Sequence, residues 1–238
     1  FSNRLTLETL AGNRLLEIGS GVALGDVDGD GRVDVYFCRT EGDNVLYRNR
    51  GGWRFEDITS ASGTACAGQY STGAAFADLD GDGDLDLLVS SLGGGIRVFH
   101  NDGQGRFTED GDSGLARMFG ATSMALADVD GDGDLDLYAT NYRTDTFHDN
   151  PRSINIQTWR RPDGSTVVEP ATRFLGLTTE AGGLEVLERG EPDFFYVNRG
   201  NGKFVPAPWN VGVFLDEDGN ALKEPPTDWR SEEHTSEL

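Results

Sequence analysis

Three short acidic segments carry the residues of this sequence that are best suited to hold a metal ion. Each follows the pattern Asp-x-Asp-Gly-Asp-Gly-x-x-Asp, which places carboxylates at loop positions 1, 3, 5 and 9 and leaves a backbone carbonyl free at position 7. Such a set offers oxygen ligands only, which suits calcium and disfavours zinc or copper. We therefore predict about three Ca²⁺ sites. Their metal residues are Asp26, Asp28, Asp30, Arg32 and Asp34; Asp78, Asp80, Asp82, Asp84 and Asp86; and Asp128, Asp130, Asp132, Asp134 and Asp136.

The alternative is that these segments are acidic turns without a metal. Closely packed carboxylates repel one another in a folded protein unless a cation lies between them, which favours the metal interpretation. An EF-hand would continue to a Glu at position 12, where this sequence has Phe37, Val89 and Ala139. A fourth acidic segment, residues 216–220 with Glu224, lacks the glycine at position 6 and predicts only a turn.

The acidic segments belong to a longer repeat. Residues 21–37 recur at 73–89 and 123–139, and each copy is followed by an apolar run that ends in Asn and by a Gly-rich turn before Phe. Short apolar runs divided by Asp/Gly or Asn/Gly turns predict four strands per copy. In the first copy we place them at 21–26, 33–38, 44–49 and 53–58.

The repeat length decides the predicted fold class. Four strands in about 50 residues is the size of one β-propeller blade, whereas a β-sandwich would not require such a repeat. We therefore predict an all-β fold, a partial β-propeller of three to four four-stranded blades with Ca-binding Asp loops, over residues 1–229. Small residues surround one larger side chain in each first strand, which suits the crowded position nearest the propeller axis. Aromatic residues that recur in register are predicted to pack between blades; they are Tyr47, Phe99 and Tyr196.

The third copy is interrupted. Asn49 and Asn101 each lie 15 residues after the last Asp of their loops, but Asn198 lies 62 residues after Asp136. We predict an insertion at 141–192 that forms short hairpins or turns. Its Trp159, Arg160 and Arg161 form an aromatic and basic cluster, which makes the insertion either a recognition element or a cover for an exposed blade edge.

Composition limits the partners and the location. The chain has 41 acidic and 20 basic residues and a net charge of −21, so nucleic acids and anionic lipid surfaces are excluded as partners. No apolar run reaches the roughly 18 residues that span a bilayer. Cys38 and Cys66 allow either one disulfide or two buried free thiols.

The ends of the chain carry their own expectations. It begins at Phe1 without a leader, which we expect to have been lost by truncation. Residues 230–238 resemble the in-frame translation of a DNA-sequencing adapter. We therefore leave them out of the fold and expect the gene product to continue past Trp229.

Signals for catalysis are weak. Residues 111–114, Gly-Asp-Ser-Gly, resemble the nucleophile segment of trypsin-like proteases, but His100 and His148 stand in no motif that would pair with the serine. Residues 19–21 lack the full dinucleotide-binding spacing. We predict no catalytic residues, no organic cofactor and no enzymatic activity.

With these motifs the chain resembles the FG-GAP/VCBS repeat family, which includes the integrin α-subunit propeller, and within it the bacterial cartilage acidic protein-like proteins with an ASPIC/UnbV segment. The resemblance rests on the Asp loops, the Leu/Val-Tyr/Phe-x-Asn segments and the Gly-x-Gly-x-Phe turns, and Phe119-Gly120 stands where the family's Phe-Gly would fall. It implies about seven blades in the parent protein. It also implies structural calcium on the aspartates at loop positions 1, 3, 5 and 9.

The resulting functional hypothesis is a calcium-binding module that lies outside the cytoplasm, extracellular, periplasmic or at the cell surface, and takes part in adhesion or in binding an unknown protein or glycan ligand. Two alternatives stay open. One is a fragment of a propeller-based polysaccharide lyase or hydrolase. The other is a purely structural surface component.

Overall fold

The computed structural model describes residues 1–116, 118–145, 155–179, 183–209 and 214–223 of the 238-residue chain. Glu224 and residues 230–238 therefore lie outside the described residues, as do parts of 141–192. In the described part of the chain, no helix is long and apolar enough to cross a membrane.

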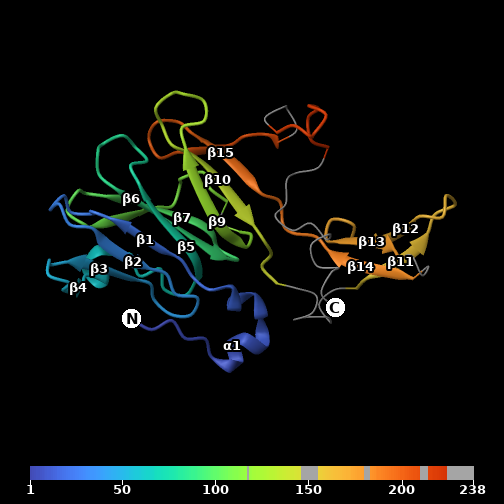
Figure 1. The fold of residues 1–238 in the computed structure, drawn as a ribbon, viewed down its shortest axis with the longest axis horizontal. Coiled ribbons are helices and arrows are strands. Elements are labelled where there is room, and N and C mark those ends of the chain that lie inside the picture. Colours follow the sequence, from blue (N-terminus) through green and yellow to red (C-terminus); the bar gives the residue numbers. More distant parts are fainter. Residues whose placement is uncertain (117, 146–154, 180–182, 210–213, 224–238) are drawn as a thin grey trace.

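The strands of the described residues form five antiparallel sheets, of which three have four strands each (Figure 1). The first sheet holds β1 (Val22–Gly25), β2 (Asp34–Phe37), β3 (Val45–Asn49) and β4 (Phe55–Asp57). The second holds β5 (Tyr70–Ala77), β6 (Asp86–Leu92), β7 (Gly95–Asn101) and β8 (Phe107–Asp110). The third holds β9 (Ala121–Ala127), β10 (Asp136–Asn141), β15 (Phe194–Asn198) and β16 (Phe204–Pro206). The four strands of the first sheet lie within their predicted ranges.

The sequence patterns did not predict three short helices, two of which precede the first sheet while the third lies between the first and second sheets. They are α1 (Leu7–Gly12), the 3-10 helix η1 (Arg14–Ile18) and α2 (Thr59–Ser62). Thr6 is the N-cap of α1, and its side chain accepts a hydrogen bond from the Thr9 amide at 3.2 Å. This N-cap satisfies an amide that the helix itself leaves without a partner.

The three sheets share one register, as expected of blade-like repeats. Val35 lies opposite Tyr47, Leu87 opposite Phe99, and Leu137 opposite Tyr196. Phe99 and Tyr196 are buried in hydrophobic clusters that also contain residues of the preceding sheet, which confirms the predicted packing between repeats. Tyr47 is only half-buried, because no described sheet precedes the first one.

Two hydrophobic clusters hold the sheets together. One joins the first sheet to the second and includes the fully buried Tyr36 and Leu46; the other joins the second to the third and includes Leu88 and Leu137. Each such buried side chain contributes roughly 1.5–3 kcal/mol of transfer free energy. Packing between sheets is therefore the main source of stability in this part of the chain.

The first strands of the three sheets lie beside one another (Figure 1). A Cβ atom on Gly21 would lie 2.8 Å from the Cα atom of Gly73, so a side chain at that position would collide with the neighbouring backbone. This close approach explains the small residues in the first strands. Within the described ranges, none of the three sheets closes on itself.

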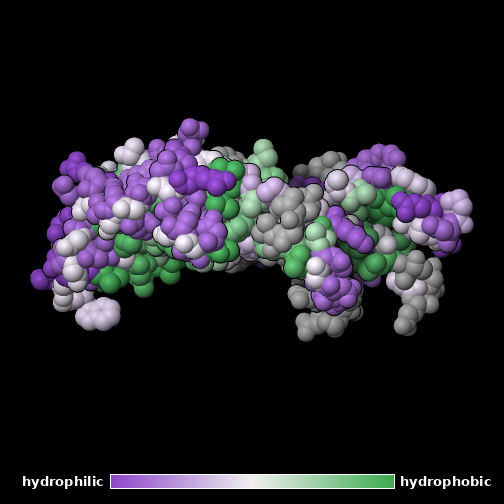
Figure 2. Space-filling view, turned by 90° about the horizontal axis from the view of Figure 1, so that it is seen from above, coloured by the Kyte–Doolittle hydropathy of each residue, from purple (hydrophilic) through white to green (hydrophobic). Residues whose placement is uncertain are grey.

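The first sheet has an open apolar face. Val22 and Leu24 on β1 are 51% and 64% exposed, and their cross-strand partners are Phe37 and Val35. In Figure 2, hydrophobic residues run along one side of the part that contains the three sheets, and hydrophilic residues cover most of the rest of that part. Part of the apolar face of the first sheet is therefore exposed.

Two hairpins stand between β10 and β15, in the segment predicted to be an insertion with short hairpins. They are β11 (Gln157–Arg160) with β12 (Thr166–Glu169), and β13 (Phe174–Thr178) with β14 (Leu184–Glu188). Figure 1 shows them set apart from the three sheets. The Glu191 carboxylate ties this segment to the start of the third sheet, because it accepts a hydrogen bond at 2.6 Å from the amide of Gly120, which directly precedes β9. It also accepts a hydrogen bond from the Thr144 hydroxyl at 3.1 Å, within the segment itself.

The two cysteines are free and buried, so of the two open alternatives the structure has two free thiols. Burial raises the pKa of Cys38 to about 12 and also raises the pKa of Cys66. Both thiols belong to the cluster between the first two sheets. They therefore act as small apolar core residues.

Candidate metal-binding loops

The three loops that connect the first two strands of each sheet are the Asp loops, residues 26–34, 78–86 and 128–136. In each loop, the carboxylate of the aspartate at position 1 accepts hydrogen bonds from backbone amides of the same loop. Asp26 accepts hydrogen bonds from the amides of Asp30 at 3.1 Å and Gly31 at 2.8 Å. Asp78 and Asp128 each accept two backbone hydrogen bonds from their own loops. Asp side chains favour such turns because they replace backbone hydrogen-bond partners locally.

The aspartate at loop position 9 joins each loop to the third strand of its sheet. Asp34 is fully buried, and its two oxygens accept hydrogen bonds from the Val27 amide at 3.1 Å and the Asn49 amide at 2.7 Å. Asp86 and Asp136 repeat both contacts. Burial raises the pKa of Asp34 and of Asp86. A carboxylate oxygen that accepts one hydrogen bond still has a lone pair for a cation.

Carboxylate oxygens converge within each loop. In each of three groups, ligand atoms from three aspartates lie within 4.8 Å of one another: Asp26, Asp28 and Asp34; Asp78, Asp80 and Asp82; and Asp128, Asp130 and Asp136. The structure therefore brings together positions 1 and 3 in every loop, with position 9 in the first and third loops and position 5 in the second.

The remaining predicted residues have other side-chain contacts. Asp30 pairs with Arg32, and the Asp132 carboxylate accepts a hydrogen bond from the Asp134 amide at 3.0 Å. A Cβ atom on Gly103 would lie 2.4 Å from an oxygen of Asp84, so the first glycine of the following turn makes room for position 7. Partial desolvation and the neighbouring aspartates raise the pKa of Asp134.

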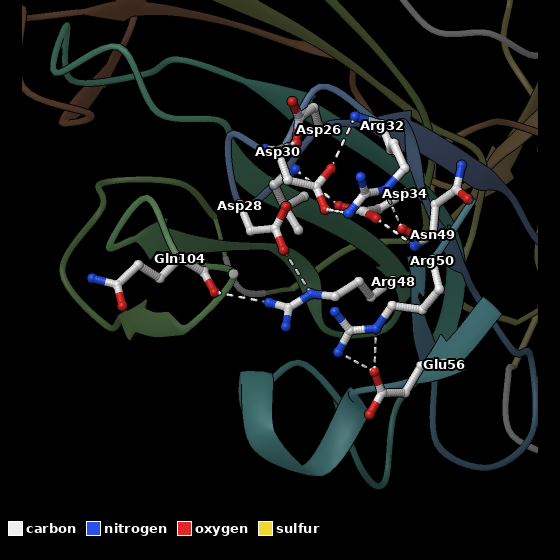
Figure 3. Close-up of polar contacts among 12 residues, drawn as sticks. Asp26, Asp28, Asp30, Arg32, Asp34, Arg48, Asn49, Arg50, Glu56 and Gln104 are labelled. Carbon is white, nitrogen blue, oxygen red and sulfur yellow. Dashed lines mark hydrogen bonds and ion pairs between the residues drawn. The ribbon is translucent and has the colours of Figure 1, made fainter. Parts of the chain in front are cut away.

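The first loop differs from the other two because arginines contact it (Figure 3). The Nε atom of Arg48 lies 2.7 Å from Oδ2 of Asp28, and its terminal nitrogen donates to the Gln104 carbonyl at 3.1 Å. The Arg32 side chain donates to the Asn49 carbonyl at 2.9 Å. The acidic charge of this loop is therefore partly balanced by the protein itself.

The sequence analysis did not single out the residue that precedes the Asn at the end of the third strand of each sheet. It is Arg48 in the first sheet, His100 in the second and Val197 in the third. Arg48 contacts Asp28, and His100 Nδ1 lies 3.4 Å from Oδ2 of Asp80. The alignment of the repeats contained this signal, because the three positions are equivalent within the apolar run.

Two of the Asn residues also link the Asp loop of one repeat to the next sheet. Nδ2 of Asn101 donates to the Val27 carbonyl at 2.9 Å, and Nδ2 of Asn198 donates to the Leu79 carbonyl at 2.8 Å. The Gly202 amide donates to the same Leu79 carbonyl at 2.9 Å. The Asn and Gly-x-Gly motifs therefore fix the Asp loop of the preceding repeat.

Comparison with known proteins agrees with this repeat architecture. Residues 26–89 and 78–139 match the family of FG-GAP-like repeats. The chain is 31% identical to Cartilage acidic protein 1 of Xenopus tropicalis over 94 residues, which cover 38% of this chain and 14% of that protein. It is 30% identical to the Homo sapiens protein of the same name over 81 residues, or 34% of this chain and 12% of that protein. The match thus spans a small part of these relatives.

Proposed function

Given that residues 26–139 carry FG-GAP-like repeats, we propose that this chain is part of a calcium-binding β-propeller that acts outside the cytoplasm as an adhesion or interaction module. The observation that carries the proposal is the convergence of carboxylate oxygens from three aspartates in each of the three loops, with positions 1 and 3 common to all. Similarity to Cartilage acidic protein 1 supports placing the module in an extracellular setting.

The donor set of the loops fits calcium. In the group of three aspartates of each Asp loop, all the converging atoms are carboxylate oxygens, the hard ligands that Ca²⁺ takes. In the first loop, Oδ1 of Asp28 is buried and accepts no hydrogen bond from any residue that the structure describes. A bound cation would supply the partner that this oxygen lacks, and it would screen the repulsion between Asp26, Asp28 and Asp34.

The propeller is inferred from the open ends of the sheet stack. Val22, Leu24 and Tyr47 lie on a face that packs against a neighbouring sheet in the second and third repeats. Further blades of the parent protein would cover this face, which this chain by itself leaves open. On this view the chain forms an open arc.

We propose that the module binds and does not catalyse. The candidate nucleophile Ser113 is 3% exposed, and its backbone carbonyl accepts a hydrogen bond from the Phe204 amide at 2.7 Å, so it belongs to a packed turn. The four residues of β11 in the insertion are all exposed, and Trp159 is 47% exposed. Trp and Arg are enriched among residues that dominate binding energy, which makes Trp159 the leading recognition residue.

Calcium binding and melting temperature test the first part of the proposal. We expect about three Ca²⁺ per chain by equilibrium dialysis, and each site stabilises the fold by about 2.7 kcal/mol when free calcium is 100 times its Kd. Asp28→Ala should remove one site, whereas Asp216→Ala, in a simple acidic turn, should remove none. Protein that binds no calcium and melts at the same temperature with and without a chelator would refute the calcium assignment.

Binding to a glycan and protein array tests the recognition role. Trp159→Ala should reduce binding to the captured ligand at least tenfold. The matched control is Trp53→Ala, because Trp53 is 94% exposed but lies in a turn of the first sheet. Equal binding by both variants would exclude Trp159 as the recognition residue, and turnover of an arrayed polysaccharide would exclude the non-enzyme proposal.

A further inference from the structure

The second Asp loop faces an imidazole, and this feature is peculiar to the second repeat. Nδ1 of His100 lies 3.4 Å from Oδ2 of Asp80 and 3.5 Å from Oδ2 of Asp86. The three ligand atoms lie within 4.8 Å of one another. We propose that His100, Asp80 and Asp86 bind a divalent first-row transition metal, for which Zn²⁺ is the probe.

The nitrogen at the centre of this group lacks a hydrogen bond. Nδ1 of His100 is buried and forms no hydrogen bond with any residue that the structure describes. A buried imidazole nitrogen that faces two carboxylates without hydrogen-bonding to either costs free energy, whereas a metal ion would accept its lone pair. The orphaned Nδ1 is therefore an observation independent of the acidic residues.

The other imidazole nitrogen faces a third carboxylate. Nε2 of His100 lies 3.5 Å from Oδ2 of Asp110, whose side chain is 11% exposed. Asp110 is itself held by Lys203 Nζ at 2.7 Å and by the Asp112 amide at 2.9 Å. Metal-bound histidines commonly donate their second N–H to such a carboxylate, which fixes the tautomer that leaves the opposite nitrogen for the metal.

The neighbouring sheet packs against one side of the imidazole, which leaves the His100 side chain 27% exposed. A Cβ atom on Gly202 would lie 2.6 Å from Cε1 of His100, so the turn of the third sheet packs directly on the ring. Asp86 is held by the amides of Leu79 and Asn101. Two of the three ligands are thus fixed by backbone contacts or by a neighbouring repeat, which limits the reorganisation that metal binding would need.

Comparison of the repeats separates this group from the calcium loops. The position of His100 holds Arg48 in the first sheet, where a permanent cation meets Asp28, and Val197 in the third, which offers no ligand. The three groups of aspartates in the Asp loops offer oxygen ligands only, whereas the group with His100 adds a nitrogen ligand. Imidazole nitrogen suits Zn²⁺ and related metals, and ligand sets of oxygen alone suit Ca²⁺. The second repeat therefore has a ligand set that the other two lack.

Asp80 connects the two kinds of site. Its Oδ1 accepts a hydrogen bond from the Asp82 amide at 3.3 Å, and its Oδ2 faces His100. It belongs both to the group with Asp78 and Asp82 and to the group with Asp86 and His100. Because Asp80 and Asp86 are also predicted calcium ligands of the second loop, zinc held by His100 would compete with calcium there, and the inference deepens the proposed function by giving this loop a different metal preference.

Zinc titration of the full chain in calcium-free buffer tests the inference. We expect one tight Zn²⁺ per chain, and His100→Val, which introduces the residue of the third repeat, should weaken that site at least about 100-fold. His148→Val is the matched control and should leave zinc binding unchanged. Zinc affinity that is equal in the wild type and in His100→Val, or a wild-type Kd weaker than about 10 µM, would overturn the assignment.

A second measurement uses the unmodified protein, in case His100→Val does not fold. Zinc should place the proton of one histidine on Nε2, as seen in the ¹⁵N spectrum of the imidazoles, and His100→Gln should identify that signal. An unchanged imidazole spectrum in saturating zinc would overturn the proposal. Calcium stoichiometry measured before zinc is added reports on the Asp loops separately and should fall by one ion per chain when zinc saturates the second loop, so failure of one proposal is distinguishable from failure of the other.

Discussion

The side chain of Asn101 in the second sheet donates a hydrogen bond to the backbone carbonyl of Val27, which lies within the Asp loop of the first sheet, at 2.9 Å. The same Nδ2 donates to the Leu85 carbonyl of its own sheet at 3.1 Å. One amide group therefore holds the loops of two consecutive repeats. This relationship means that loop geometry and packing between sheets are coupled.

The coupling predicts the effect of removing the amide. Asn101→Ala leaves the buried Val27 carbonyl without this donor and should cost about 1–3 kcal/mol in the free energy of unfolding. Asn49→Ala is the matched control, because Nδ2 of Asn49 donates to Val33 within its own sheet only. Urea unfolding of both variants checks this. Equal losses would contradict a role for Asn101 between repeats.

Arg48 predicts a difference between the first loop and the others. Arg48→Met removes the cation that pairs with Asp28, so the chelated protein should lose about 1 kcal/mol of stability. Calcium should restore most of that loss and bind this loop about fivefold more tightly, since it no longer competes with the guanidinium. Calcium titration followed by melting of both proteins tests this. A loss that calcium does not reduce would show that Arg48 acts by packing alone.

Cys38 predicts a pH dependence. Its pKa in the fold is about 12 against an ordinary 9.0, so the stability that it contributes is complete below pH 9 and is lost as pH rises from 9 toward 12. The free energy of unfolding should therefore fall with pH in that window. Cys38→Ala should make the fall shallower by up to about 1.4 kcal/mol per pH unit. Urea unfolding between pH 8 and 10.5 measures both slopes, and identical slopes would contradict the assignment.

Trp53 predicts a stabilising substitution. It has a φ of 59° and is 94% exposed, whereas the equivalent positions are Gly105 and Gly202, with φ of 76° and 68°. Trp53→Gly relieves left-handed backbone strain and should raise the free energy of unfolding by about 0.5–1 kcal/mol after the entropy cost of glycine. Trp53→Ala keeps the strained backbone and should be nearly neutral. Greater stability of the alanine variant would exclude strain as the cause.

Much of the local structure could be predicted from the sequence, because its determinants are close in the chain. Short apolar runs and Asp/Gly or Asn/Gly turns located the four strands of the first repeat, and the Asp spacing located the candidate loops. Asp26 accepts its hydrogen bonds from residues within five positions, so the loop pattern alone indicates where its carboxylate lies. The recurrence of Phe99 and Tyr196 also predicted correctly that they pack between sheets.

The contacts between repeats could not be predicted in this way. Asn101 and Val27 are separated by 74 residues, and Asn198 and Leu79 by 119. The apolar run suggested strand formation but not that His100 would face Asp80, since a strand residue can point to either side of its sheet. The sequence shows that Arg48, His100 and Val197 are equivalent, but only the structure shows which of them contacts its loop.

The sequence by itself determined that this is an all-β repeat chain with acidic loops suited to cations, because strand periodicity, turn chemistry and carboxylate spacing are local properties. Tertiary structure decided which carboxylates converge, which one Arg48 neutralises and which one meets an imidazole. Those outcomes depend on the stacking of one sheet on the next, which brings distant residues within hydrogen-bond range. The physical reason is that the energy of an electrostatic contact depends on the distance between the charges in space and not on their separation along the chain.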